Sequence, residues 1–431
     1  MVSYPMEIQD QMNYFALKIS SQMLHCALFF EGHLDDSLLR EAIRRSIEIE
    51  KILGCRLVRR DSSVFWESRD DSAHFVPFEI IETANVLEKM ESFWIQDIDL
   101  ENGPLFQIRV FRNTNDCLCI KISHAISDAG GLKNYVALLA RLYTDLANGA
   151  ENPLKYSSSV DRSQAQILQS LEPSVSTKLS EKSGDFFRNV RPNWSFPSDG
   201  YQKAKPKYSV VRIEKELFHA IMDMAKEKKV TLNDMLLTAF CCALRKDEGY
   251  PFSQPILIQI PVDLRRYLAD KNTLPICNMT GTEYLNINID NNNFDDVLEK
   301  VHDYMQAAKT SFPGLVSAFA NEFLASMGFE QAMSIAQGSM EKSIQYNVSI
   351  PIMSNMGIIA DDCKSFGDLT AKDGYLVSPV MYSPGFMLGV SSFGDSLTLT
   401  VGFSEESIQI EHINKFLKRI ASELEEACAY A

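Results

Sequence analysis

Hydrophobic and polar residues alternate along a stretch in the first third of the chain that ends at a histidine. Leu118, Ile120 and Ile122 fall on one face of a predicted strand over residues 118–124, and His124 ends this row. A histidine at the end of a rigid strand can project into a cleft and act there as a general base.

A tight loop and a helix are predicted directly after this strand. Asp128 comes four residues after His124, and Gly130 and Gly131 follow it. Glycine can take positive φ or allow close approach of another backbone segment. Apolar residues then recur at helical spacing over residues 132–142. The pattern therefore predicts strand, tight loop and helix, with the histidine and the aspartate at the junction.

The remaining periodicity predicts an α/β (α+β) chain in two lobes. At 431 residues, the chain exceeds the size at which a single hydrophobic core keeps growing. Residues 152–206 are rich in Ser, Pro, Gln and Lys and indicate a crossover between the lobes. We predict a first lobe over residues 1–155, a linker over 156–206 and a second lobe over 207–431.

Individual elements follow from the same patterns and from turn and cap residues. In the first lobe we expect a strand at 25–30, a helix capped by Asp35 or Asp36, and a hairpin of 106–111 with 118–124. In the second lobe we expect a capping box at Thr231–Asp234, a strand at 255–261 and a strand at 348–353 that ends before Ser354. A hairpin of 385–393 with 397–403 and a closing helix at 413–427 are expected at the end of the chain.

The end of the chain repeats the layout of the first lobe. A strand, a loop and a helix follow a hairpin both at 118–142 and at 397–424. Gly402 and Phe403 stand where a second histidine would be expected. Two similar lobes would then share one site, and only the first would supply the base.

Charge and cysteine usage narrow the function classes. The formal net charge of -15 repels phosphate backbones and anionic membrane surfaces, which argues against nucleic-acid binding. An anionic ligand such as coenzyme A would need a local basic patch. The candidates for such a patch are Arg56, Arg59 and Arg60, or Lys226, Lys228 and Lys229.

The nine cysteines form no Cys-x-x-Cys pair and no metal-finger spacing. Several lie in apolar runs, which suits reduced thiols and predicts a cytoplasmic protein. The chain begins without a basic segment followed by an apolar one, so no signal peptide is expected. No apolar run reaches the roughly 18 residues that span a bilayer, so no membrane span is expected.

The sequence lacks the motifs of other common enzyme classes and of nucleotide-binding and metal sites. The sequence contains no Gly-x-Ser-x-Gly elbow, no Gly-x-x-x-x-Gly-Lys loop, no Gly-x-Gly-x-x-Gly and no His-Glu-x-x-His. His219 and Asp223 repeat the spacing of His124 and Asp128, but they lie in an amphipathic helical pattern and are interpreted as structural. The remaining histidines lack partners at metal-ligand spacing, so no metal is expected; they are His25, His33, His74, His302 and His412.

The His-x-x-x-Asp motif and its companions resemble one superfamily over essentially the whole chain. The companions are Val262–Arg266, Leu274–Asn278, Thr231–Asp234, and Asp99-Leu100 with Gly103–Leu105. Together these segments resemble the coenzyme-A-dependent acyltransferases, which include chloramphenicol acetyltransferase, plant BAHD enzymes, alcohol acetyltransferases, wax ester synthases and the condensation domains of nonribosomal peptide synthetases.

The resemblance implies a chloramphenicol acetyltransferase-like fold and direct acyl transfer. Each lobe would be a mixed sheet with flanking helices, with His124 at the centre of a tunnel between the lobes. An acyl-CoA co-substrate, with an acetyl group favoured, would enter from one side, and a small alcohol or amine from the other. His124 would take the proton of the attacking hydroxyl or amine, and no permanently bound cofactor is implied.

The resemblance also assigns the neighbouring residues. Asp128 would be structural and pair with an arginine, with Arg265 favoured and Arg56 second. Ser354 and Asn355 are the candidates for stabilising the oxyanion. The motif is supported by Ser123, Gly130, Gly131 and Asn278.

Two alternatives stay open. The first is a free-standing condensation enzyme that takes its acyl group from a carrier protein; Ser123 argues against it, because condensation domains usually carry a second histidine at that position. The second is a catalytically inactive binding protein on the same fold. The Asp-Phe-Gly-Trp-Gly segment of BAHD enzymes is absent, and Ser354–Gly357 resembles the alcohol acetyltransferase pattern instead.

Overall fold

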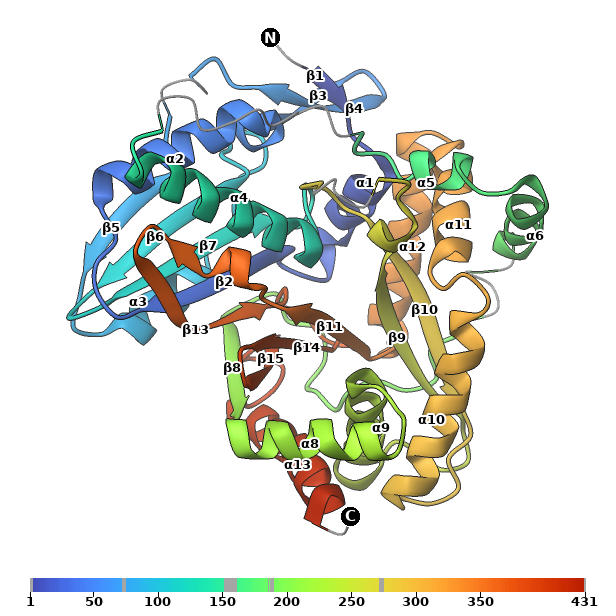
Figure 1. The fold of residues 1–431 in the computed structure, drawn as a ribbon. Helices are drawn as coiled ribbons and strands as arrows, with labels where there is room; N and C mark the ends of the chain where they lie inside the picture. The colour runs from blue at the N-terminus through green and yellow to red at the C-terminus, as the bar shows by residue number, and fades with distance from the viewer. Residues whose placement is uncertain are drawn as a thin grey trace.

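Two six-stranded mixed sheets form the framework of the protein (Figure 1). The computed structural model describes residues 3–71, 75–150, 161–184, 186, 190–270 and 275–429. The predicted linker therefore lies partly outside the described residues, as does Leu274 of the motif that ends at Asn278.

The first sheet has the order β12-β13-β2-β7-β6-β5. Its strands are β2 (Met23–Phe30), β5 (Phe78–Glu82), β6 (Phe106–Arg112), β7 (Asp116–Ser123), β12 (Ser365–Phe366) and β13 (Leu369–Val377). All neighbours are antiparallel except β5 and β6. Central strand β7 is buried along its whole length and carries His124 at its carboxyl end.

The second sheet has the order β10-β9-β11-β14-β15-β8. Its strands are β8 (Pro206–Ile213), β9 (Ile256–Asp263), β10 (Thr280–Ile287), β11 (Ile352–Ile358), β14 (Met387–Phe393) and β15 (Ser396–Ser404). β11 runs parallel to both of its neighbours, and the other pairs are antiparallel. Both sheets are therefore mixed, in agreement with the expectation from the sequence.

Helices cover both sheets (Figure 1). They are α1 (Ile8–Phe15), α2 (Asp36–Ile49), α3 (Val86–Trp94), α4 (Ala129–Ala147), α5 (Ala165–Gln169), α6 (Pro173–Ser183), α8 (Lys215–Glu227), α9 (Leu232–Asp247), α10 (Phe294–Lys309), α11 (Leu315–Ala325), α12 (Phe329–Tyr346) and α13 (Ile410–Ala429). A small third sheet consists of β1 (Ser3–Pro5), β4 (Ser63–Ser68) and β3 (Cys55–Arg60).

Each six-stranded sheet has its own hydrophobic core. Helices α2 and α4 bury their apolar faces against the first sheet, and α9 and α13 bury theirs against the second. Most of α9 is buried, which matches the near-continuous apolar run that follows its capping box at Thr231 and Asp234. The burial of these faces removes apolar surface from water and holds each sheet rigid behind the junction at His124.

The chain does not keep its two halves strictly apart. Strands β12 and β13 belong to the C-terminal half, but β13 pairs with β2 in the first sheet. Residues 378–386 then lead from β13 into β14 of the second sheet. The predicted lobe boundaries at 155 and 206 stay a prediction.

The predicted elements around the site are largely confirmed. The hairpin of β6 and β7, the helix cap at Asp35, the hairpin of β14 and β15 and the closing helix are present. The strand predicted at 348–353 is wrong in its bounds, because β11 covers Ile352–Ile358. Ser354 and Asn355 therefore lie within a strand, whose parallel pairing with β14 continues past them through a bulge.

Candidate active site

A cavity of about 430 Å³ is bordered by both sheets and reaches the side chain of His124. Its wall is formed by α1, the start of α4, strands β9, β10 and β11, and the connection between β13 and β14. The imidazole is half-buried and lines this cavity. Side chains that lie far apart in the sequence therefore meet around one histidine.

The backbone of His124 is held from three directions. Its N–H donates to the carbonyl oxygen of Gln22 at 2.8 Å. Its carbonyl oxygen accepts from Asn13 Nδ2 at 2.9 Å and from Asn278 Nδ2 at 2.8 Å. These contacts come from the segment before β2, from α1 and from the segment before β10, so the residue is fixed between both halves of the chain.

The side chain of Asn278 determines which imidazole nitrogen carries the hydrogen. Asn278 Nδ2 donates to Asp10 Oδ1 at 2.8 Å, and because a carboxylate only accepts, this contact fixes the orientation of the amide. Asn278 Oδ1 then lies 3.2 Å from His124 Nδ1 and accepts its hydrogen. Asn13 Nδ2 lies 3.1 Å from the same ring nitrogen and donates one of its two hydrogens to the His124 carbonyl oxygen; with Nδ1 protonated, its approach to Nδ1 is a contact and not a hydrogen bond. Nε2 is left as the basic nitrogen.

Burial lowers the pKa of His124 below its ordinary value, and the charge of Asp128 and the hydrogen bond with Asn278 offset part of this shift. The imidazole is therefore neutral at pH 7 and able to accept a proton. This is the protonation state that a general base needs.

Asp10 is a buried carboxylate that anchors the asparagine. Its second oxygen accepts from Trp66 Nε1 at 2.9 Å and from the guanidinium of Arg162 at 3.1 Å. Arg162 in turn donates to the carbonyl oxygens of Ile276 at 2.8 Å and Ile126 at 2.9 Å. This network connects the imidazole, through Asn278, to a largely buried charge pair.

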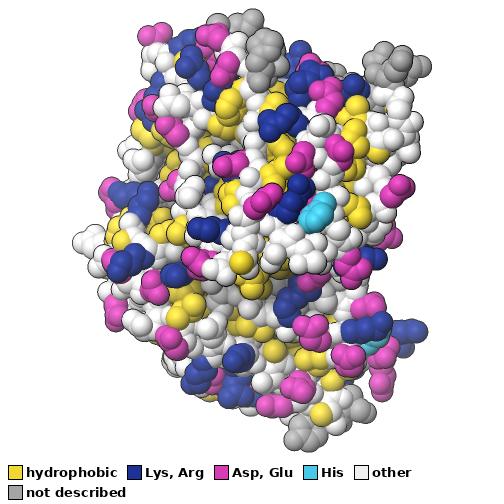
Figure 2. Space-filling view, turned by 90° about the vertical axis from the view of Figure 1, so that its left-hand side faces the viewer, with side chains coloured by type: hydrophobic (Ala, Val, Ile, Leu, Met, Phe, Trp, Pro, Cys, Tyr) yellow, Lys and Arg dark blue, Asp and Glu magenta, His cyan; other side chains and the backbone are white. Residues whose placement is uncertain are grey.

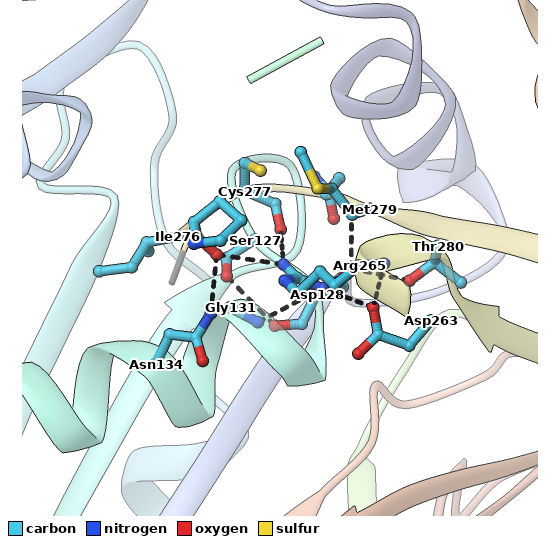
Figure 3. A network of polar contacts seen from close by, with 12 residues as sticks. Ser127, Asp128, Gly131, Asn134, Asp263, Arg265, Ile276, Cys277, Met279 and Thr280 are labelled. Carbon is cyan, nitrogen blue, oxygen red and sulfur yellow. Dashed lines mark hydrogen bonds and ion pairs between the residues drawn. The ribbon is translucent and has the colours of Figure 1, made fainter. Parts of the chain in front are cut away.

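Asp128 and Arg265 form a two-point ion pair (Figure 3). The distances are 2.9 and 3.0 Å, and the carboxylate also accepts from Gly131 N, Met279 N and the Thr280 hydroxyl. Burial alone would raise the pKa of Asp128, but Arg265 and these donors outweigh it and lower the pKa to about 2. Because both oxygens are engaged here, the carboxylate is not available to orient the imidazole.

The structure changes the interpretation of the two glycines. Asp128 caps α4, and Gly130 and Gly131 lie in its first turn rather than in a loop. Neither takes positive φ; both are required by close approach. A Cβ on Gly130 would lie 2.6 Å from Arg265 Nη1, and one on Gly131 would lie 2.3 Å from Ser127 Oγ and 3.0 Å from the Cys277 backbone.

The other predicted site residues fall into two groups. Ser354 and Asn355 line the same cavity as His124. The amide of Asn355 contacts Asn233 Oδ1 at 3.4 Å and accepts from Gly357 N at 3.0 Å. Ser123 is buried and its hydroxyl accepts from a backbone N–H two residues ahead, so it shapes the turn and does not line the cavity.

Sequence reasoning missed Asp10, Asn13 and Gln22. Asn13 contacts His124 from 111 positions away, and Asp10 contacts Asn278 from 268 positions away, so no spacing motif relates them. The one local signal is that both are polar residues on a short amphipathic helix. Gln22 contributes its backbone, and its amide carries no sequence signal.

The candidate basic patches are engaged within the protein. The guanidinium of Arg59 lies over the ring of Tyr14, and Arg60 pairs with Glu67. Lys228 lies 3.0 Å from Asp295. On the face drawn in Figure 2, basic and acidic side chains are interspersed. Neither patch is therefore a purely basic surface.

Two absences concern the described part of the chain alone. Within it, no group of three or more His, Cys, Asp or Glu side chains is arranged to hold a metal ion. Among its helices, none is both long and apolar enough to cross a membrane.

Comparison with protein families matches the condensation domain model to residues 7–312, which is well over half of the chain. The chain belongs to the condensation domain family. The C-terminal domain model of the wax ester synthase and diacylglycerol acyltransferase family (WS/DGAT) also matches residues 276–427. The family indicates acyltransferase activity, and the expected membership of the acyltransferase superfamily is confirmed.

Solved structures show the same fold at low identity. The first condensation domain of the calcium-dependent antibiotic synthetase, in complex with a substrate analogue, is 14% identical, with a TM-score of 0.74 and coverage of 100% of this chain and 97% of that one. Trichothecene 15-O-acetyltransferase from Fusarium sporotrichioides is 14% identical, with a TM-score of 0.72 and coverage of 98% and 94%.

A third similar structure is the starter condensation domain of rhizomide synthetase in complex with C8-CoA. It is 14% identical, with a TM-score of 0.66 and coverage of 98% of this chain and 95% of that one. A comparison with curated proteins gave no match. At these identities the structures establish the two-lobed fold of this condensation-family chain and nothing finer.

Proposed function

We propose that this condensation-family protein transfers an acyl group from a CoA thioester to a hydroxyl or amine acceptor, with His124 as the general base. The observation that carries the proposal is the asparagine contact: Asn278 Oδ1 lies 3.2 Å from His124 Nδ1 and leaves Nε2 free to take a proton in a cavity bordered by both sheets. A positioned base of this kind contributes about 10² to 10⁴-fold to the rate.

The proposed reaction proceeds by direct attack. The acceptor oxygen or nitrogen forms a bond with the thioester carbonyl carbon while its proton moves to His124 Nε2. The carbon–sulfur bond then breaks, and the protonated imidazole returns the proton to the leaving thiolate. No acyl-enzyme is formed, which agrees with the absence of a nucleophile elbow in the sequence.

We propose Ser354 as the group that stabilises the oxyanion. Ser354 and Asn355 both line the cavity, but the amide of Asn355 is already held by Asn233 and Gly357. The hydroxyl of Ser354 can rotate toward a developing negative charge on the thioester oxygen.

The CoA donor is supported by two relatives of the same fold. One is an acetyltransferase and the other a starter condensation domain in complex with C8-CoA. A second candidate donor is a carrier-protein thioester, favoured by the condensation domain match over residues 7–312.

We also propose a cytoplasmic location. The described cysteines are all free thiols, eight of them buried, which supports this location.

The donor question has a direct experiment. Thiol release and product mass are measured with acetyl-CoA and longer acyl-CoAs, each with a panel of small alcohols and amines, and in parallel with the same acyl groups on a pantetheinylated carrier protein. The proposal expects acceptor-dependent thiol release with free acyl-CoA. Turnover only with the carrier would select the second candidate, and no turnover with either donor would leave the inactive binding protein as the explanation.

A further inference from the structure

Two buried polar residues that line the His124 cavity each carry a side-chain oxygen without a hydrogen-bond partner among the described residues. Gln22 is 6% exposed and Ser378 is 1% exposed, and both line the cavity. Gln22 Oε1 and Ser378 Oγ accept or donate no hydrogen bond in the described part of the chain. A buried polar atom left in this way is costly, so a pair of them in a cavity calls for a functional explanation.

The two residues lie on adjacent segments, Gln22 directly before β2 and Ser378 directly after β13. Ser20 pairs with Met381 in an antiparallel bridge, and the backbone N–H of Ser21 donates to the carbonyl of Val380 at 2.9 Å. Continuing this antiparallel register places Gln22 opposite Pro379, and the pairing of β13 with β2, which ends at Val377 and His25, continues to place Ser378 opposite Leu24. Both residues therefore lie in one region of the cavity wall.

The orientation of the Gln22 amide is fixed. Its Nε2 donates to Ser20 Oγ, and that hydroxyl already gives its hydrogen to the Ala16 carbonyl at 3.0 Å. Gln22 Oε1 is thus the atom that remains, and it can only accept. Gln22 also has φ of 54°, in the left-handed region that residues with a side chain rarely take, while its carbonyl holds the His124 N–H at 2.8 Å.

We propose that Gln22 and Ser378 form a subsite that binds a neutral hydroxyl group on one of the two substrates. Gln22 Oε1 requires a donor, and Ser378 Oγ can serve as donor or acceptor, so a ligand hydroxyl matches the hydrogen-bonding needs of both atoms. Neither residue is charged, and their neighbours Leu24 and Met381 on the cavity wall are apolar, which favours a neutral ligand over an ionic one. This inference rests on the proposed function and adds a substrate class to it.

The hydroxyl can come from the acceptor or from the acyl group, and paired substrates separate the two sources. One arm compares linear alkanols with the matching diols at constant acyl-CoA. The other arm compares butyryl-CoA with hydroxybutyryl-CoA at a constant alcohol. In the arm that supplies the ligand, wild-type kcat/KM is expected to favour the hydroxylated member by roughly tenfold or more, because its absence leaves buried groups unpaired.

Variants test the two residues independently. Ser378→Ala and Gln22→Met are each expected to reduce the preference to about twofold or less. Ser407 is a matched control, because it is also a buried serine whose hydroxyl lacks a partner among the described residues, but it does not line the cavity. Ser407→Ala is expected to keep the wild-type preference. Thermal melts of all variants identify any that fail to fold.

The outcomes are distinguishable. A wild-type enzyme that transfers acyl groups with no preference in either arm overturns the subsite but leaves the proposed function intact, even if a variant is unfolded. A preference that survives in every folded variant also overturns it. Absence of transfer with all pairs removes both the proposed function and this inference.

Discussion

Asn278 contacts the imidazole of His124 with one end of its amide and the carboxylate of Asp10 with the other, at 3.2 and 2.8 Å. A neutral amide thus takes the place that a carboxylate holds in a serine-protease triad, and the buried carboxylate lies one residue further away. The arrangement fixes the tautomer without placing a negative charge directly on the ring.

Asn278→Leu is expected to lower kcat by about 10 to 100-fold, because the imidazole loses the acceptor that holds Nδ1–H and the ring can rotate or change tautomer. The measurement is kcat and KM with acyl-CoA and a good acceptor. Asn134→Leu is the matched control, because Asn134 contacts the same segment through the Pro275 carbonyl at 3.1 Å but not the ring. Equal losses in both variants would assign Asn278 a merely structural role.

The ion pair of Asp128 with Arg265 is expected to support folding and activity together. Asp128→Asn leaves a buried guanidinium without its counter-charge, which costs about 3 to 5 kcal/mol of unfolding free energy. In Asp128→Asn, both the free energy of unfolding measured with urea and the transfer activity should fall. His124→Ala should lose activity but remain folded. A cooperative melt of Asp128→Asn at the wild-type temperature would refute this division of roles.

The same pair makes stability depend on acid. The pKa of Asp128 is lowered to about 2 in the folded protein, below its unfolded value, so its contribution is complete above pH 4 and is lost as pH falls toward 2. The unfolding free energy of the wild type should therefore fall across this window by more than that of Asp128→Asn. Parallel pH curves for the two proteins would show that Asp128 is not responsible.

Close packing at the start of α4 should make Gly131 intolerant of a side chain. Gly131→Ala places a methyl group 2.3 Å from Ser127 Oγ and against the Cys277 backbone, and is expected to cost about 1 to 3 kcal/mol. Gly338 lies in α12 with nothing within 4 Å of an added Cβ, so Gly338→Ala should instead stabilise by about 0.5 to 1 kcal/mol. Thermal unfolding measures the stability of both variants. The prediction requires that the melting temperature falls in Gly131→Ala and rises in Gly338→Ala.

The pH dependence of kcat/KM should reflect the lowered pKa of His124. Because burial favours the neutral ring, the acidic limb should lie below pH 6.5 and the rate should be level above it. Initial rates between pH 4.5 and 8 at constant ionic strength provide the profile, with the range chosen to bracket the ordinary histidine pKa of about 6.5. An acidic limb above pH 7 would argue that another group is the base.

Local patterns predicted much of the framework. Strand β7, the hairpin that it forms with β6, the cap at Asp35 and the capping box of α9 all follow from residues close together in the sequence. The bounds of β11 were missed, because Ser354 and Asn355 look like a turn but are held in register by the neighbouring strand β14. Tertiary pairing outweighed local preference there.

The site was predictable only where a motif marked it. The spacing of His124 and Asp128 and the glycine after Ala129 indicated a junction that lines the cavity in the structure. Asp10, Asn13 and Ser378 reach it through contacts between distant segments, which periodicity does not encode. The sequence also did not indicate why Gly130 and Gly131 are glycines, because the atoms that exclude a Cβ there include those of Arg265 and Cys277, which lie far away in the sequence.

The central claim is that the imidazole of His124 takes the proton from the attacking acceptor. The most direct measurement is acceptor-dependent thiol release from acyl-CoA by His124→Ala, compared with wild type and with His219→Ala, a histidine that pairs with Asp395 on the surface. We expect His124→Ala to keep its fold and lose about 10² to 10⁴-fold in kcat while His219→Ala remains active. A folded His124→Ala protein that transfers acyl groups at the wild-type rate would contradict the account.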